Sequence, residues 1–136
     1  MFNQSLPIIN FTGRPLSTDL KRAGVLEPPF GFQSYVSHLL DIDHVPKDSE
    51  IEEICNSVAS AVLGACEKLD IEEGYALIEC PSFITSALEK AIDTLSPCEP
   101  LHAFYAVVKE EEPCGDGSVT VKERFALKGF ITVSHL

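Results

Sequence analysis

Short apolar segments alternate along the chain with longer segments of helical periodicity, and this alternation constrains the fold more than any other feature. The first two apolar segments are Leu6–Thr12 and Tyr75–Cys80. Both are too short for an amphipathic helix and are bounded by Pro or Gly, so they predict strands close to the core. Leu101–Lys109 is a third apolar segment, and Val119–Val133 alternates apolar and polar residues. These two segments predict two further strands.

The segments between the predicted strands favour helices. Short helices are expected over residues 17–24 and 30–40. Ser49 and Glu52 have the spacing of a capping box, and the apolar residues that follow recur at threes and fours. This pattern predicts a longer helix that ends before the second strand. Residues 82–95 predict the last helix.

The predicted order of elements is β-α-α-α-β-α-β-β. Strands separated by helices pair in parallel with right-handed crossovers, while Asp116-Gly117 is a hairpin signal between the last two strands. The expected fold class is therefore α/β, a small Rossmann-like, mostly parallel sheet with covering helices and a C-terminal antiparallel β-hairpin. A chain of 136 residues fits one domain, residues 1–136.

The chain carries a formal net charge of −11, with 21 Asp and Glu against ten Lys and Arg. This excess argues against extended binding to a DNA or RNA duplex, whose affinity comes mainly from neutralised phosphates. The acids lie mostly in residues 41–120, whereas residues 1–40 and 121–136 are mildly basic. A site for one small anion near the chain ends is therefore compatible with the charge.

Five cysteines occur without a C-x-x-C pair, and the four histidines are scattered. No metal-binding motif is present, so we expect no metal and no cofactor. The first residues lack the features of a signal peptide, and the apolar segments are too short to span a membrane. We therefore expect a cytoplasmic protein with reduced thiols and no membrane association.

Ligands of open α/β sheets bind beyond the carboxyl ends of the strands, and this rule selects the candidate site. Thr12, Gly13 and Arg14 follow the first strand, and Ser82 and Thr85 begin the helix after the second, with Ser82 as its expected N-cap. A guanidinium group and the free N–H groups of a helix start both suit phosphate, so these residues predict an anion site. In the alternative interpretation, Arg14 is solvated or pairs with an acid and Ser82 only caps its helix.

Three other features have competing interpretations. Cys80 has the location of a nucleophile, but no arginine stands six residues further on, and a buried packing thiol is favoured. His102 falls on a predicted core strand, where a hydrogen-bonded core histidine is favoured. Lys122, Arg124 and Lys128 form either a basic strip or charges that protect an edge strand, and the second is favoured. No catalytic residue is identified.

Asn10–Ser17 reads Asn-Phe-Thr-Gly-Arg-Pro-Leu-Ser. It resembles the start of a family of small uncharacterised proteins found in phages, plasmids and near bacterial defence loci. That family begins with Asn, Leu or Phe, Thr, any residue, His or Arg, Pro, any residue, and Thr or Ser. Further segments resemble its second block and closing hairpin, namely residues 75–92, 101–104, 116–119 and 128–130. The chain departs from the family at residues 79–81, where a Gly-rich turn is usual, and at residues 105–108, where Ser and Arg are usual.

More distantly, the chain is similar to the CARF-like (CRISPR-associated Rossmann-fold) proteins of type III CRISPR systems, which include sensors and ring nucleases for cyclic oligoadenylates. This resemblance implies a homodimer that binds a nucleotide or cyclic oligonucleotide signal in bacterial or phage defence or counter-defence. It also adds Asn10 to the candidate ligand-binding residues. If the protein is an enzyme, the resemblance implies a metal-independent phosphodiesterase of the ring-nuclease type. The acidic charge favours an alternative, a non-enzymatic protein that binds or inhibits a basic protein partner.

Overall fold

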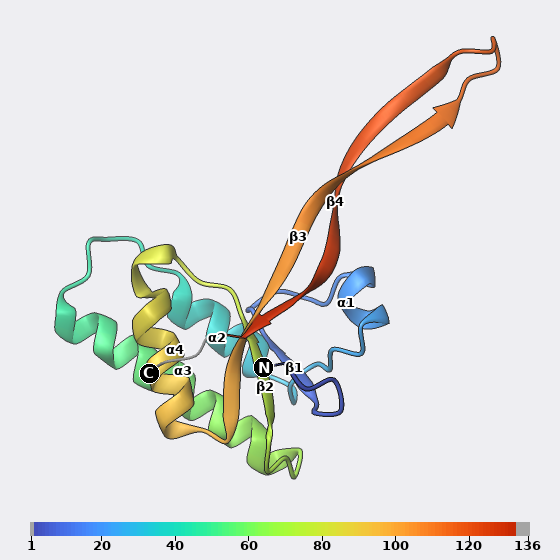
Figure 1. The fold of residues 1–136 in the computed structure, drawn as a ribbon. Helices are drawn as coiled ribbons and strands as arrows, with labels where there is room; N and C mark the ends of the chain where they lie inside the picture. The colour runs from blue at the N-terminus through green and yellow to red at the C-terminus, as the bar shows by residue number, and fades with distance from the viewer. Residues whose placement is uncertain (1, 133–136) are drawn as a thin grey trace.

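The chain folds into a four-stranded mixed sheet with helices on both faces and a long hairpin that projects from the body of the molecule (Figure 1). The computed structural model describes residues 2–132. In chain order the elements are β1 (Ile8–Phe11), α1 (Thr18–Arg22), α2 (Phe32–Leu40), α3 (Asp48–Lys68), β2 (Gly74–Ile78), the 3₁₀ turn η1 (Ser82–Ile84), α4 (Thr85–Leu95), β3 (Cys98–Pro113) and β4 (Val119–Thr132). The predicted α/β class and the predicted order of elements are confirmed.

The strands lie in the order β1-β2-β3-β4. β1 pairs in parallel with β2, and β2 pairs in parallel with β3. β4 adds the predicted antiparallel edge. Because the order of the parallel strands does not reverse, both right-handed crossovers place helices α2, α3 and α4 on one face, and α1 lies on the other (Figure 1). The sheet therefore lacks the reversal of strand order at which ligands of such folds usually bind.

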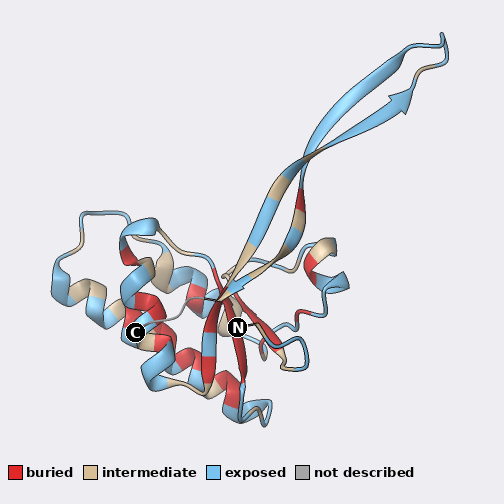
Figure 2. Ribbon diagram, in the orientation of Figure 1, coloured by how far each residue is buried: buried red, intermediate tan, exposed pale blue. Residues whose placement is uncertain are grey.

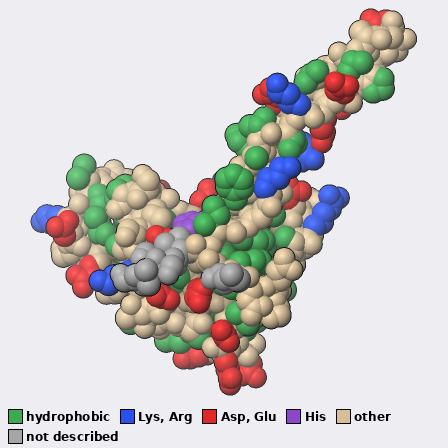
Figure 3. Space-filling view, in the orientation of Figure 1, with side chains coloured by type: hydrophobic (Ala, Val, Ile, Leu, Met, Phe, Trp, Pro, Cys, Tyr) green, Lys and Arg blue, Asp and Glu red, His purple; other side chains and the backbone are tan. Residues whose placement is uncertain are grey.

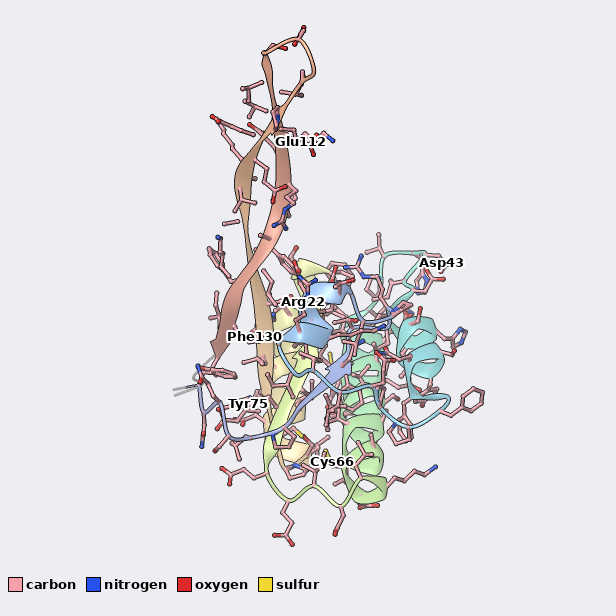
Figure 4. The ribbon with its side chains drawn as sticks, turned by 90° about the vertical axis from the view of Figure 1, so that its right-hand side faces the viewer. Arg22, Asp43, Cys66, Tyr75, Glu112 and Phe130 are labelled. Atoms are coloured by element: carbon pink, nitrogen blue, oxygen red, sulfur yellow. The ribbon has the colours of Figure 1, made fainter. Side chains whose placement is uncertain are left out.

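Every residue of β1 and β2 is buried, which explains why both strands are apolar apart from Asn10. The larger core cluster lies between the sheet and helices α2–α4 and includes Ile9 and Phe11. A smaller cluster on the α1 face contains Tyr75, whose ring centroid lies 5.1 Å from that of Phe2. Tyr75 of this cluster is labelled near the foot of the hairpin in Figure 4.

The start of α3 differs from the predicted capping box. Lys47 is the N-cap, and Ser49 and Glu52 both lie inside the helix. The prediction that these two residues form a capping box is therefore wrong. Glu50 stabilises this end instead, because its carboxylate accepts from the backbone N–H of Lys47 (3.4 Å) and hydrogen-bonds with Nε2 of His44 (2.7 Å). The acidic first turn is also favoured by the helix dipole.

His44 is expected to titrate above its usual range because its ring lies between two carboxylates. Hydrogen bonds with Asp43 and Glu50 raise the pKa of His44 from 6.5, and the imidazole lowers the pKa of both acids. This contact is therefore fully present below the pKa of an unfolded histidine and is lost as the pH rises through the raised value. It is also lost as the pH falls through the lowered carboxyl values. An NMR titration of Glu50→Gln should give His44 a pKa closer to 6.5, and an unchanged pKa would contradict this assignment.

The hairpin of β3 and β4 is longer than predicted and forms an arm (residues 104–130). The sequence predicts a polar connection over residues 110–118, but the two strands stay paired as far as Pro113 opposite Val119. The expected turn at Asp116-Gly117 is confirmed at the tip. Figure 2 shows that the arm is exposed along most of its length, whereas the strands of the body are buried.

A bulge near the base of the arm changes which side chains share a face. Gly129 lies opposite Phe104 and Leu127 lies opposite Tyr105, which leaves Lys128 as an extra residue in β4. An extra residue reverses the alternation of the strand relative to its partner. The side chains beyond the bulge therefore lie on the face opposite to the one that a regular strand would give them.

This bulge corrects the predicted faces of the last strand. The alternation of the sequence predicts one apolar face for the odd-numbered residues from Val121 to Val133. This prediction is wrong, because Ile131 and Leu127 lie on different faces. Val133 itself lies outside the described residues.

The basic strip considered for the last strand does not form. Lys122 Nζ lies 2.9 Å from a carboxylate oxygen of Glu112, and Arg124 Nε lies 2.6 Å from one of Glu110. Lys128 is the bulge residue. Lys122 and Arg124 therefore pair with acids on the neighbouring strand.

Candidate functional site

The loop after β1 is held by Asn10, which is fully buried. Its Nδ2 donates to the carbonyl of Arg14 (2.8 Å) and to Oε1 of Glu27 (3.0 Å). Its Oδ1 accepts from the backbone N–H (3.1 Å) and the hydroxyl (2.7 Å) of Thr12. The hydrogen-bonding capacity of the amide is thus used inside the protein. Asn10 shapes the loop, and its position does not support the expected ligand contact.

Gly13 gives this loop its turn. Its φ is +79°, and a Cβ at this position would lie 3.1 Å from Cα of Ser37. The N–H of Gly13 donates to Oε1 of Gln33 (3.0 Å), and Nε2 of Gln33 donates to the carbonyl of Asn10 (3.0 Å). The loop is therefore fixed by both β1 and α2, and it presents the exposed side chain of Arg14.

Arg14 and Glu79 form an ion pair across the ends of β1 and β2. Nη2 of Arg14 donates to Oε1 of Glu79, and the two side chains remain 66% and 57% exposed. This hydrogen bond raises the pKa of Arg14 further, so the guanidinium stays charged. The pairing with an acid that the sequence left open is thus observed. An exposed pair contributes at most about 1 kcal/mol, so Arg14 can exchange Glu79 for another anion.

The N-cap predicted at Ser82 is wrong. Residues 82–84 form a 3₁₀ turn, and α4 begins at Thr85. The Ser82 side chain is exposed and makes no hydrogen bond within residues 2–132. The Thr85 hydroxyl donates to the carbonyl of Pro81 (3.2 Å) and lies 3.4 Å from Sγ of Cys80. The Ser82 hydroxyl is therefore available to a ligand, whereas the Thr85 hydroxyl is engaged.

These groups meet at a cleft of about 700 Å³ beyond the carboxyl end of β2, here named the β2 cleft. Thr12 and Arg14 line it from the loop after β1, and Ser82 and Thr85 line it from the start of α4. The volume falls in the range of small-molecule pockets. Four of the six predicted ligand-binding residues thus share one cleft.

A second cleft of about 830 Å³, the α2 cleft, shares the Arg14–Glu79 pair with the first. Gly13 lines the α2 cleft and not the β2 cleft, whereas Thr12 and Arg14 line both. Glu27, Asp41 and Glu79 bring three carboxylates to the α2 cleft, whereas Glu79 is the one acid among the described residues that line the β2 cleft. An anion is therefore better accommodated in the β2 cleft.

His102 and Glu89 form a pair at the β2 cleft that the sequence does not predict. His102 on β3 lines the β2 cleft, and its Nε2 lies 2.9 Å from Oε2 of Glu89 on α4. The Glu89 side chain is 7% exposed and that of His102 is 27% exposed. The hydrogen bond expected of a core histidine is present, but the ring also reaches the cleft. With the proton on Nε2, Nδ1 is the nitrogen that can accept another.

Cys80 also lines the β2 cleft, but its environment does not activate it. Burial raises the pKa of its thiol, and Sγ contacts the hydroxyl of Thr85. The group is therefore protonated at neutral pH and is a poor nucleophile. The structure supports the packing role favoured from the sequence.

Cys114, near the tip of the arm, is expected to be the most reactive thiol. Its Sγ lies 2.9 Å from the hydroxyl of Thr120, and hydrogen bonds with Thr120 and Ser118 lower its pKa. Iodoacetamide at pH 7.5 should label Cys114 at least about tenfold faster than Cys80. The buried cysteines should react only after unfolding, namely Cys55, Cys66 and Cys98.

Peptide mass spectrometry measures these labelling rates, with Cys114→Ser as the control for the assignment of the fast site. Faster labelling of Cys80 than of Cys114 would show an activated thiol in the cleft and contradict the assignment.

Within residues 2–132 there is no group of three or more His, Cys, Asp or Glu placed to hold a metal ion. In the same part of the chain, no helix is long and apolar enough to cross a membrane. The side chains that line the β2 cleft can bind an anion through Arg14, donate a hydrogen bond from Ser82 and move a proton at His102.

The fold and the cleft define a small Rossmann-like α/β protein with a ligand-sized cleft at the ends of its parallel strands. Comparison with protein-family models, with curated proteins and with solved structures finds no match.

Proposed function

We propose that the protein binds a nucleotide or cyclic oligonucleotide through its phosphate groups in the β2 cleft. The observation that carries the proposal is that Arg14 and Ser82, from the ends of two adjacent parallel strands, line one cleft of about 700 Å³. A guanidinium fork and a free hydroxyl match the oxygens of a phosphate. A signal nucleotide of bacterial defence or counter-defence, which the sequence resemblance implies, is the first ligand class to test.

The rest of the β2 cleft suits the nucleoside part of such a ligand. Tyr105 lines the cleft from the base of the arm and is 40% exposed, and an exposed aromatic ring of this kind can stack on a base. Leu20 and Leu77 supply an apolar surface. An apolar lining with a few polar groups is typical of pockets for small organic ligands.

The ion pair between Glu79 and Arg14 has to break when a phosphate binds to Arg14. In the free protein it neutralises the one arginine of the β2 cleft. A phosphate offers more charge and more acceptor oxygens than one carboxylate, and the exposed ion pair is weak, so a phosphate can displace it. We infer that Glu79 acts as an internal competitor that lowers the affinity for anions.

The His102–Glu89 pair supports a second step, cleavage of the bound ligand without a metal. The imidazole can take the proton from a ribose 2′-hydroxyl, and the 2′-oxygen then attacks the adjacent phosphorus. The bond from phosphorus to the 5′-oxygen of the next nucleotide breaks, and that oxygen takes up a proton. The products are a 2′,3′-cyclic phosphate and a free 5′-hydroxyl.

The alternative, an acidic protein that binds a basic partner, has less support. The acids of residues 41–120 lie in separate places, mainly at the two ends of α3 and along the arm. The 21-residue α3 holds its ends about 30 Å apart. Glu110 and Glu112 on the arm pair with bases. On the face shown in Figure 3, acidic side chains are likewise scattered rather than gathered in one patch.

Isothermal titration calorimetry of the whole chain tests this proposal, with cyclic di-, tri-, tetra- and hexanucleotides, adenosine monophosphate and inorganic phosphate as probes. We expect at least one nucleotide to bind with a Kd below about 100 μM, and Arg14→Ala to weaken that binding at least about tenfold. Chromatography of the same mixtures detects cleavage, which His102→Ala should abolish while binding persists. Absence of binding across the panel, or equal binding by Arg14→Ala, would remove the proposal.

A further inference from the structure

Two buried cysteine thiols lie in contact at the amino ends of β2 and β3, the opposite end of these strands from the β2 cleft. Cys66 is in the last turn of α3, and Cys98 is the first residue of β3. Their Sγ atoms are 3.1 Å apart, and each residue is 1% exposed. Figure 4 labels Cys66 in the lower part of the molecule, well below the arm. The pair takes no part in the chemistry proposed for the cleft.

The contact distinguishes these two cysteines among the five of the chain, all of which are free. The sulfur atoms of a disulfide are about 2.05 Å apart. A movement of about 1 Å therefore brings Cys66 and Cys98 from contact to bonding distance. By contrast, the sulfurs of Cys80 and Cys114 contact threonine hydroxyls, at 3.4 Å and 2.9 Å. The geometry thus favours one particular disulfide.

The two thiols differ in acidity because one donates a hydrogen bond to the other. This bond lowers the pKa of Cys66, against the effect of burial, and raises the pKa of Cys98. Cys66 is therefore the thiol that supplies a thiolate, while Cys98 keeps its proton. A thiolate beside a second thiol is typical of peroxide-sensitive cysteine pairs, in which the second thiol captures the sulfenic acid formed on the first.

We propose that Cys66 and Cys98 form a redox site that hydrogen peroxide converts to a disulfide. The Cys66 thiolate attacks one oxygen of the peroxide, and the O–O bond breaks. Cys66 becomes a sulfenic acid, and the other oxygen leaves as hydroxide and takes up the proton that Cys66 lost. The sulfur of Cys98 then attacks that of Cys66, the S–O bond breaks, and the hydroxyl leaves as water with the proton of Cys98. Two thiols and one peroxide thus give one disulfide and two waters.

Peroxide reaches Cys66 through a local opening of the structure. Residues 67–70, which follow it at the end of α3, are all exposed, and helix ends open more readily than helix interiors. Hydrogen peroxide is smaller than iodoacetamide, so an opening that excludes the alkylating reagent can still admit the peroxide. The disulfide closes the segment from Cys66 to Cys98, which contains β2 and α4. A closed loop of this kind restricts the unfolded chain and so stabilises the folded protein.

Peptide mass spectrometry of the full chain after treatment with about 1 mM hydrogen peroxide tests this site. Cys114→Ser serves as the parent chain, because it removes the reactive thiol of the arm that would otherwise link two chains. We expect one disulfide, between Cys66 and Cys98, and its reversal by dithiothreitol. The Tm of the oxidised chain should exceed that of the reduced chain by at least about 5 °C. A folded chain that forms no disulfide, or that links two other cysteines, would overturn the proposal.

Cys55→Ala in the same parent chain is the matched control, because Cys55 is another buried cysteine of α3, 2% exposed, and should leave the disulfide intact. Cys98→Ala leaves the sulfenic acid of Cys66 without a thiol to capture it. Dimedone should then label Cys66, and peroxide should no longer raise the Tm. A rise in Tm that persists in Cys98→Ala would contradict the assignment. Circular dichroism checks that both variants fold, and the disulfide of the parent chain decides the proposal where one does not.

Discussion

Asn10→Asp is expected to lower the free energy of unfolding by about 3 kcal/mol at pH 7. The variant keeps the shape of the side chain and the acceptor for Thr12, but it puts a carboxylate oxygen where the amide nitrogen donates to Arg14 and Glu27. Three acceptors then meet with no proton between them, and the new carboxylate is in a fully buried position. Thermal melting should show a Tm lower by about 10 °C. Burial raises the pKa of the new carboxyl group, so the deficit should shrink as the pH falls through that raised value toward about 4.

A second substitution distinguishes this cause from a general intolerance at position 10. Glu27→Gln alone should change the stability by less than about 1 kcal/mol. Combined with Asn10→Asp, it supplies an amide that can donate to the new carboxylate, so the double variant should recover about half of the loss. If Asn10→Asp melts within 2 °C of the wild type, the loop that carries Arg14 is not held in the way described.

Glu79→Gln and Arg14→Ala are expected to change nucleotide affinity in opposite directions. Glu79 forms an ion pair with the Arg14 guanidinium in the free protein. Removing the charge of Glu79 should therefore strengthen binding of the nucleotide found by calorimetry about fivefold to tenfold. Arg14→Ala removes the phosphate contact and should weaken the same binding at least about tenfold. Calorimetry under identical salt conditions measures both changes.

The matched control for Glu79→Gln is Glu73→Gln. Glu73 is exposed in the turn before β2, at the opposite end of that strand from Glu79, so the substitution changes the net charge equally but not the cleft. It should change the affinity by less than about twofold. Equal gains from the two variants would attribute the effect to the overall charge and remove the role given to Glu79.

The order of elements could be predicted from the sequence because burial on both faces leaves a pattern in the chain itself. β1 and β2 are short, apolar and bounded by Pro or Gly, and the helices between them repeat their apolar residues at threes and fours. The predicted starts of α3 and α4 were wrong for a local reason. Lys47 and the 3₁₀ turn after Pro81 set the helix starts through backbone geometry, which the presence of Ser49 and Ser82 does not reveal.

The arm and the His102–Glu89 pair could not be predicted because both depend on contacts between distant segments. Residues 110–113 have the composition of a polar connection, and they extend the strand because Glu110 and Glu112 form diagonal ion pairs with Arg124 and Lys122 of the neighbouring strand. The prediction that Arg14 and Ser82 lie near each other was more robust. It required only that the two parallel strands be neighbours in the sheet, and β1 and β2 pair directly.

The most direct test of the β2 cleft is a titration of the ¹⁵N-labelled wild-type chain followed by NMR, with the tightest-binding nucleotide of the calorimetric panel. The account predicts saturable shift changes at Thr12–Arg14, at Ser82–Thr85 and at His102–Tyr105, which line or flank the cleft. The signals of the arm tip, residues 114–118, should stay in place. Shift changes at Gln33–Asp41 with none at Ser82–Thr85 or His102–Tyr105 would contradict it. So would changes confined to residues 106–130, or no change at 1 mM nucleotide, which is about ten times the highest Kd expected here.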